Sequence, residues 1–146
     1  MRTCEIWVKN TRVMTDYETI SEGMDLAISD GKILAVQESG KEVWQCREVL
    51  DGRDKIFMPG LIDSHMHTGQ QLLKGLVLDA KPIIWTRIML PFESTMTAEK
   101  MRLSAELAAV EMIKSGTTAF VESGSYEMNA AAEIYEKSGL RGCLSY

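Results

Sequence analysis

The sequence predicts an α/β protein in two parts, a β-rich segment over residues 1–58 and a β/α segment over residues 59–146. The first part contains short apolar runs separated by Asp-Gly dipeptides, which are typical of hairpins. After Pro59 and Gly60, strand and helix patterns alternate, which indicates parallel strands joined by helical crossovers. With 45% hydrophobic and 25% charged residues, the composition is that of an ordinary globular protein.

Five short strands are expected in the first part. They are Cys4 to Lys9, Asp25 to Ser29, Lys32 to Gln37, Glu48 to Leu50 and Lys55 to Met58. Asp30-Gly31 and Asp51-Gly52 each separate two of these runs, and Asp-Gly is favoured in two-residue hairpin turns. We therefore expect part of a small antiparallel sheet structure.

A long helix is expected in the second part, between Thr97 and Gly116. Threonine is a favoured N-cap residue, and glycine is favoured just past the end of a helix. The large aliphatic residues of this segment recur at helical spacing. They are Leu103, Leu107, Val110 and Ile113. We expect this face of the helix to pack on a sheet.

The remaining elements of the second part continue the strand and helix rhythm. We expect strands at Leu61–His67, Thr117–Glu122 and Leu140–Tyr146, with a helix at Asn129–Ser138 before the last strand. Parallel strands with helical crossovers occur in doubly wound sheets and in (β/α)₈ barrels, and the pattern is compatible with both.

The connection from Thr68 to Met96 is long and apolar for a loop. Its large apolar residues are Leu72, Leu73, Leu76, Ile83, Ile84, Trp85, Ile88, Met89 and Phe92. We expect them to be buried. Because α/β folds place active sites at the carboxyl ends of parallel strands, this connection is expected to line or cover a pocket, or else to be a helical insertion that only stabilises the fold.

Asp63-Ser64-His65-Met66-His67 lies on the first expected parallel strand and holds the only two histidines in the chain. Side chains alternate along a strand, so Asp63, His65 and His67 should share one face. Neutral imidazoles are ligands of zinc, iron and manganese, and two of them side by side can bind one cation. The alternative is a pair of half-exposed strand histidines.

Several segments of the chain match one known family. They are Trp7–Asn10, Asp30–Val36, Glu48–Gly52, Met58–His67, Leu72–Gly75, Leu90–Glu93 and Lys114–Thr118. On these segments the chain resembles the amidohydrolase superfamily, in the branch of adenosine-type, S-adenosylhomocysteine and chlorotriazine aminohydrolases. The resemblance implies part of a small β-sandwich followed by an incomplete (β/α)₈ TIM-type barrel of about three parallel strands.

The resemblance also implies roles for particular residues. It assigns His65 and His67 as ligands of a divalent metal, zinc or alternatively iron, and Glu93 and Trp85 as substrate-binding residues. In that branch the glutamate of the L-P-x-E segment holds a ribose. The spacing from Trp85 to Pro91 is shorter than in nucleoside deaminases, so an exposed loop glutamate is the alternative for Glu93. Glu122 has two interpretations, a group at the mouth of the barrel or a solvated or structural carboxylate.

The implied reaction is hydrolysis of a C–N bond on a purine-nucleoside-like or aminotriazine-like ring by metal-activated water. The family places a further histidine, an acid-base glutamate and a metal-binding aspartate on later strands, which this sequence does not contain. A (β/α)₈ barrel needs about 250 residues. We therefore expect a truncated or split enzyme that is inactive alone, and we expect no catalytic residue in this chain. The rest of the barrel or a partner chain would complete the enzyme, which is expected to be a homo-oligomer when complete.

Two other classes of protein share part of this pattern. A cupin-like metal enzyme would need an acid soon after the second histidine, and residues 68–74 contain none. A non-catalytic assembly or binding module remains an alternative. The net charge of −5 argues against nucleic acid, and no apolar run suits a membrane span. The three widely spaced cysteines indicate reduced thiols, and we expect a cytoplasmic protein. The family resemblance implies a small-molecule substrate.

Overall fold

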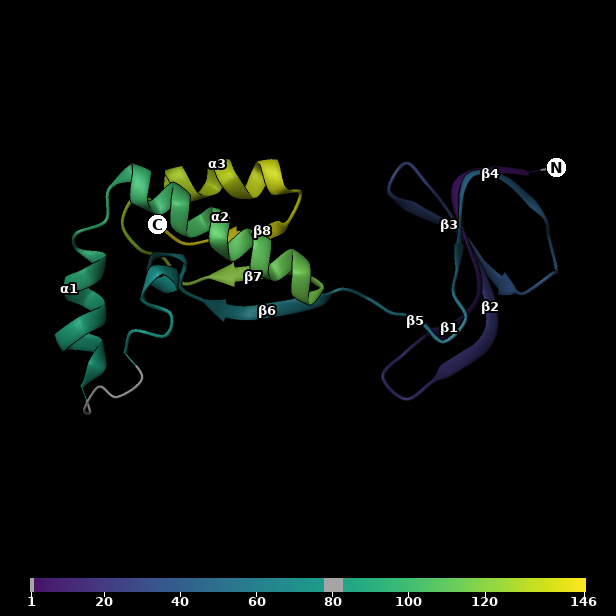
Figure 1. The fold of residues 1–146 in the computed structure, drawn as a ribbon, viewed down its shortest axis with the longest axis horizontal. Helices are drawn as coiled ribbons and strands as arrows, with labels where there is room; N and C mark the ends of the chain where they lie inside the picture. The colour runs from purple at the N-terminus through teal and green to yellow at the C-terminus, as the bar shows by residue number, and fades with distance from the viewer. Residues whose placement is uncertain (1, 78–82) are drawn as a thin grey trace. The chain divides into compact units, whose positions relative to one another are not determined.

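The computed structural model describes residues 2–77 and 83–146 of the chain. The chain divides into two compact units, Met1–Pro59 and Gly60–Tyr146 (Figure 1). The division falls at Pro59-Gly60, where the sequence pattern changes from strands and turns to alternating strands and helices.

The first unit is a five-stranded mixed sheet. Its strands are β1 (Arg2–Met14), β2 (Ile20–Ser29), β3 (Lys32–Glu38), β4 (Trp44–Asp51) and β5 (Ile56–Phe57). The order is β3-β2-β1-β4, and β5 also pairs with β1. β1 is antiparallel to β2 but parallel to β4 and β5, so the expectation of a purely antiparallel sheet is wrong.

The two Asp-Gly dipeptides of this unit have different structural roles. Asp30-Gly31 joins the antiparallel strands β2 and β3, with φ angles of 51° and 67°, as predicted. Asp51-Gly52 forms no hairpin. The Gly52 N–H donates to the Lys9 carbonyl at 2.8 Å, and a Cβ on Gly52 would lie only 2.5 Å from the Thr11 Cβ. This glycine therefore allows the chain to pass closely against β1.

The second unit contains a three-stranded parallel sheet with the order β6-β7-β8. Its strands are β6 (Leu61–Met66), β7 (Thr117–Glu122) and β8 (Arg141–Leu144), and its long helices are α2 (Ala98–Ser115) and α3 (Met128–Ser138). Both helices lie on the same face of the sheet (Figure 1). The parallel α/β arrangement is thus confirmed, and the described residues form an open sheet, not a closed barrel.

Helix α2 begins and ends as predicted but buries the opposite set of residues. Thr97 accepts a hydrogen bond from the Lys100 N–H, and Gly116 ends the helix at φ 81°. The buried residues are Met101, Ser104, Ala105, Ala108, Ala109 and Met112. The aliphatic residues expected in the core are exposed: Leu103 by 56%, Leu107 by 38%, Val110 by 54% and Ile113 by 55%. Small side chains let α2 approach the sheet and α3 closely, which explains the orientation.

The described part of the connection between β6 and α2 contains three short helical segments. Thr68–Leu73 is a 3₁₀ helix, Trp85–Met89 is a π-helical turn, and α1 spans Leu90–Glu93. Residues 78–82 of this connection lie outside the described part of the chain. Leu73 is buried, but Leu76, Ile83 and Trp85 are 75%, 62% and 44% exposed, so the expected burial of this apolar stretch is wrong for these three residues.

Among the helices of residues 2–77 and 83–146, none has the length and apolar character required to cross a membrane.

The orientation of α2 predicts different effects for substitutions at two positions that are two residues apart. Met101 is fully buried, so Met101→Ala should lower the free energy of unfolding by about 2–5 kcal/mol. Leu103→Ala removes an exposed side chain and should change it by about 0.5 kcal/mol or less. Urea unfolding followed by circular dichroism would measure both. A larger loss for Leu103→Ala than for Met101→Ala would mean that the aliphatic face is the buried one.

Candidate functional site

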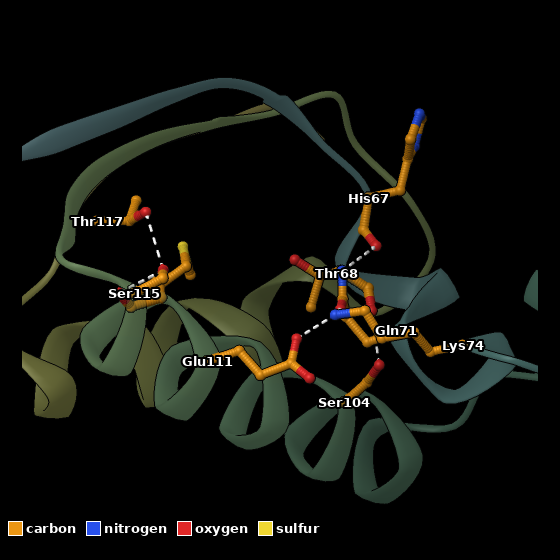
Figure 2. A network of polar contacts seen from close by, with 9 residues as sticks. His67, Thr68, Gln71, Lys74, Ser104, Glu111, Ser115 and Thr117 are labelled. Atoms are coloured by element: carbon orange, nitrogen blue, oxygen red, sulfur yellow. Dashed lines mark hydrogen bonds and ion pairs between the residues drawn. The ribbon is translucent and has the colours of Figure 1, made fainter.

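The two histidines project at the carboxyl end of β6. His65 lies within the strand and is exposed, and His67 directly follows the strand and is half-buried. Met66 between them is buried in the core formed with residues of α2 and α3. The strand alternation therefore places both imidazoles on the side opposite Met66, as the sequence predicted. In Figure 2 the His67 ring points away from α2.

The two imidazoles converge on one point. Their Nε2 atoms are 3.2 Å apart, and the ring centroids are 4.9 Å apart at an interplanar angle of 83°. Two nitrogen ligands of a tetrahedral zinc ion, each about 2.0–2.1 Å from the metal, are separated by about 3.3 Å. The pair therefore has the spacing required to hold one cation through both Nε2 atoms.

No third ligand joins this pair among the described residues. Residues 2–77 and 83–146 contain no group of three His, Cys, Asp or Glu side chains that could hold a metal ion. Asp63, which was expected on the same face, accepts a hydrogen bond from the His65 N–H at 3.2 Å. It lines a hollow together with Lys74 and Glu111. The structure thus brings His65 and His67 together but does not add Asp63 to them.

Two side chains contact the His67 ring. The Trp85 ring lies edge-on to it, with the centroids 5.4 Å apart. Ser123, which directly follows β7, places its Oγ 2.8 Å from Nδ1 and also 3.4 Å from Nε2 of His67. The same hydroxyl donates to the Met66 carbonyl at 3.0 Å. These contacts restrict the ring, and the structure places Trp85 beside the histidine pair.

Glu93 is buried, with 5% of its surface exposed. Its Oε1 accepts a hydrogen bond from Nε2 of Gln70 at 2.6 Å, which links α1 to the 3₁₀ helix that follows His67. The alternative of an exposed loop glutamate is therefore wrong. Burial and the bond to Gln70 hold this carboxylate close in space to the segment after the histidine motif.

Glu122, at the end of β7, is also buried, with 1% of its surface exposed. Its Oε2 accepts hydrogen bonds from the Thr68 N–H at 2.6 Å and from the Thr68 hydroxyl, and its Oε1 accepts one from the Gly124 N–H at 3.1 Å. Glu122 is thus not a solvated carboxylate. Of the two interpretations from the sequence, these contacts favour the structural one.

Thr68 and Tyr135 were not singled out by the sequence analysis. The Tyr135 hydroxyl is 2.7 Å from the Thr68 Oγ1, and the Tyr135 side chain packs in the core against Phe120. Burial raises the pKa of Tyr135 to about 12; the hydrogen bond with Thr68 opposes this rise, and the charge of Glu122 adds to it. The available signal was a tyrosine on the apolar face of the expected helix, where a buried hydroxyl needs a polar partner.

Comparison with known proteins agrees with the resemblance seen in the sequence. Residues 56–146 match the model of the amidohydrolase family. A 5-methylthioadenosine/S-adenosylhomocysteine deaminase from Halothermothrix orenii is 34% identical over 97% of this chain and 34% of that protein. A 5'-deoxyadenosine deaminase from Methanosarcina acetivorans is 36% identical over 97% of this chain and 33% of that protein.

Solved structures show the same fold. An adenosine deaminase from Xanthomonas campestris with bound zinc superposes with a TM-score of 0.86 at 24% identity, over 97% of this chain and 33% of that one. A mutant atrazine chlorohydrolase from Arthrobacter aurescens, complexed with zinc and atraton, gives a TM-score of 0.79 at 22% identity, over 97% of this chain and 35% of that one.

The chain spans about one third of the length of the relatives that it matches. The family model nevertheless covers more than half of the chain, including β6 with both histidines and all of β7 and β8. On this match, and on the relatives that align with nearly the whole chain, the protein belongs to the amidohydrolase family.

Proposed function

We propose that this chain is the N-terminal portion of a metal-dependent amidohydrolase that hydrolyses a C–N bond and so deaminates a purine-nucleoside-like or aminotriazine-like ring. The names of its relatives, which are deaminases of adenosine derivatives, support the reaction type. The observation that carries the proposal is the 3.2 Å separation of the two Nε2 atoms at the carboxyl end of β6.

His65 and His67 are the proposed metal ligands, with zinc as the first candidate and iron as the second. Both rings offer nitrogen donors at a spacing that suits one tetrahedral cation. When bound, zinc lowers the pKa of a coordinated water molecule to about 7 and so makes it a nucleophile at neutral pH. The part of His65 and His67 is to hold the ion at the strand end, and Ser123 and Trp85 restrict the movement of His67.

Trp85 and Glu93 are the proposed substrate-binding residues. The Trp85 indole is 44% exposed and lies against His67, so it offers an apolar surface next to the proposed metal position for a planar ring. One oxygen of Glu93 accepts from Gln70. The proposed role of its other oxygen is to accept a hydrogen bond from a substrate hydroxyl, as the resemblance implies.

Residues 1–58 are proposed to form a β-sandwich segment, and residues 59–146 to form the first part of a metal-dependent hydrolase barrel. Further polypeptide, from the same protein or from a partner chain, is proposed to cover the second unit. The exposed aliphatic residues of α2 support this, because Leu103, Val110 and Ile113 are each more than half exposed. The complete enzyme is proposed to be a cytoplasmic homo-oligomer with a small-molecule substrate.

Metal binding by the isolated chain is the first test. We expect one zinc ion to bind weakly, and His65→Ala or His67→Ala to reduce the affinity by about tenfold or more, since each variant removes one of only two nitrogen ligands. Competition with a chromophoric chelator would measure the affinity. Cys143→Ala is the matched control, because Cys143 is an exposed thiol on β8. Unchanged affinity in both His65→Ala and His67→Ala would contradict the proposed site.

Catalysis by the isolated chain is the second test. We expect the zinc-loaded chain to release no ammonia from adenosine, 5'-deoxyadenosine or an aminotriazine, because the sequence has no third histidine and the described residues bring no acid to the metal position. A coupled ammonia assay, with a complete adenosine deaminase as the positive control, would measure this. Sustained turnover by the chain alone would show that it is catalytically complete.

A further inference from the structure

We infer that Glu122 is a positioning residue, which fixes the His67 ring by clamping the next residue, Thr68. This inference rests on the proposed function in one respect, since it gives His67 a role that requires exact placement. The clamp itself is a feature of the described residues and does not depend on which metal or substrate is bound.

The carboxylate of Glu122 holds Thr68 at two atoms. Its Oε2 accepts from the Thr68 N–H at 2.6 Å and also from the Thr68 hydroxyl. Its other oxygen accepts from the Gly124 N–H at 3.1 Å, which fixes the carboxylate to the turn after β7. Both Thr68 and Glu122 have 1% or less of their surface exposed, so water does not compete for these bonds.

The directions of these hydrogen bonds require a carboxylate at residue 122. The Thr68 N–H and the Gly124 N–H can only donate. The Thr68 hydroxyl has a single proton, and because this proton is donated to Glu122, the Tyr135 hydroxyl at 2.7 Å must donate to the Thr68 Oγ1. A side-chain amide would turn its NH₂ group either toward Thr68, which loses both Thr68 bonds, or toward the Gly124 N–H, which releases the side chain from the turn after β7.

A second contact holds Thr68 from the side of α2. Ser104 donates from its Oγ to the Thr68 carbonyl at 2.6 Å, and Figure 2 shows this bond between the helix and the segment after His67. The N–H, the side chain and the carbonyl of Thr68 are thus bound by β7, α3 and α2. The residue directly after His67 is therefore fixed through its N–H, its side chain and its carbonyl.

Burying a carboxylate in this position is a poor way to gain stability alone. A buried charge costs free energy that its hydrogen bonds only offset, and an apolar residue of similar size is often as stable or more stable. What the carboxylate provides is a fixed direction for the chain at His67, whose Nε2 must stay 3.2 Å from that of His65. A shift of about 0.5 Å exceeds the tolerance of a metal or catalytic site.

The test compares Glu122→Gln with Met128→Ala in the full 146-residue chain. Met128 is buried in α3, so its truncation destabilises the same unit from another place. We expect Glu122→Gln to weaken zinc binding by about 10–100-fold, as loss of outer hydrogen bonds to metal ligands does elsewhere. We expect Met128→Ala to leave the affinity within about twofold of the parent chain as long as it is folded.

A spectroscopic measurement separates positioning from folding and does not need metal. In the metal-free chain, Glu122→Gln should shift the imidazole ¹⁵N and ¹H resonances of His67, whereas Met128→Ala should leave them unchanged. If Glu122→Gln lowers the unfolding midpoint but moves neither the resonances nor the affinity, Glu122 is only structural and the inference is overturned. Equal effects of both variants on affinity would overturn it too.

If Glu122→Gln does not fold, Thr68→Val takes its place in the test, because this variant keeps the N–H bond but removes the hydroxyl. Thr68→Ser should then restore the His67 resonances. Failure of the serine variant to restore them would overturn the inference. If the parent chain binds no zinc, the proposed metal site is wrong, and the resonances of the metal-free chain still decide whether Glu122 positions His67.

Discussion

Two imidazoles can share one cation only if the end of their strand is held in place, and the β-sheet alone does not hold it here. The pairing of β6 with β7 has a register shift between Asp63 and Met66, so the regular ladder is interrupted beside His65. Other hydrogen bonds hold the chain where the regular strand pairing is interrupted. Ser123 binds the Met66 carbonyl with both its N–H and its hydroxyl, and Glu122 binds the next part of the chain at Thr68.

The small residues of α2 serve the same end of the sheet. Ala105 and Ala108 let the helix lie close to the strands, and at that distance the short side chain of Ser104 reaches the Thr68 carbonyl. A face of large aliphatic residues would hold the helix further away, out of reach of this bond. The orientation of α2 is therefore coupled to the position of the histidine motif.

Local signals in the sequence predicted the local features well. Thr97, Gly116 and the Asp30-Gly31 turn have the predicted roles, because a cap or a tight turn depends on a few adjacent residues. The position of His65 and His67 on one face also follows from strand alternation, although their use as metal ligands stays a prediction.

Features set by distant contacts could not be predicted in this way. Helix α2 has two faces at helical spacing, one of alanine, serine and methionine and one of leucine, valine and isoleucine, and only the fit to the sheet and α3 selects the first. Similarly, Asp51-Gly52 has the composition of a hairpin, but close contact with β1 directs β4 and β5 to that strand instead. Thr68 is separated from Glu122 by 54 residues and from Tyr135 by 67.

The two buried glutamates of the second unit are suited to different tasks. Glu122 receives three hydrogen bonds from Thr68 and Gly124, which use most of the acceptor sites of a carboxylate. A carboxylate bound in this way has few acceptor sites left for a substrate hydroxyl. Glu93 receives one side-chain bond, from Gln70. The contacts therefore favour Glu93 over Glu122 as the proposed substrate ligand.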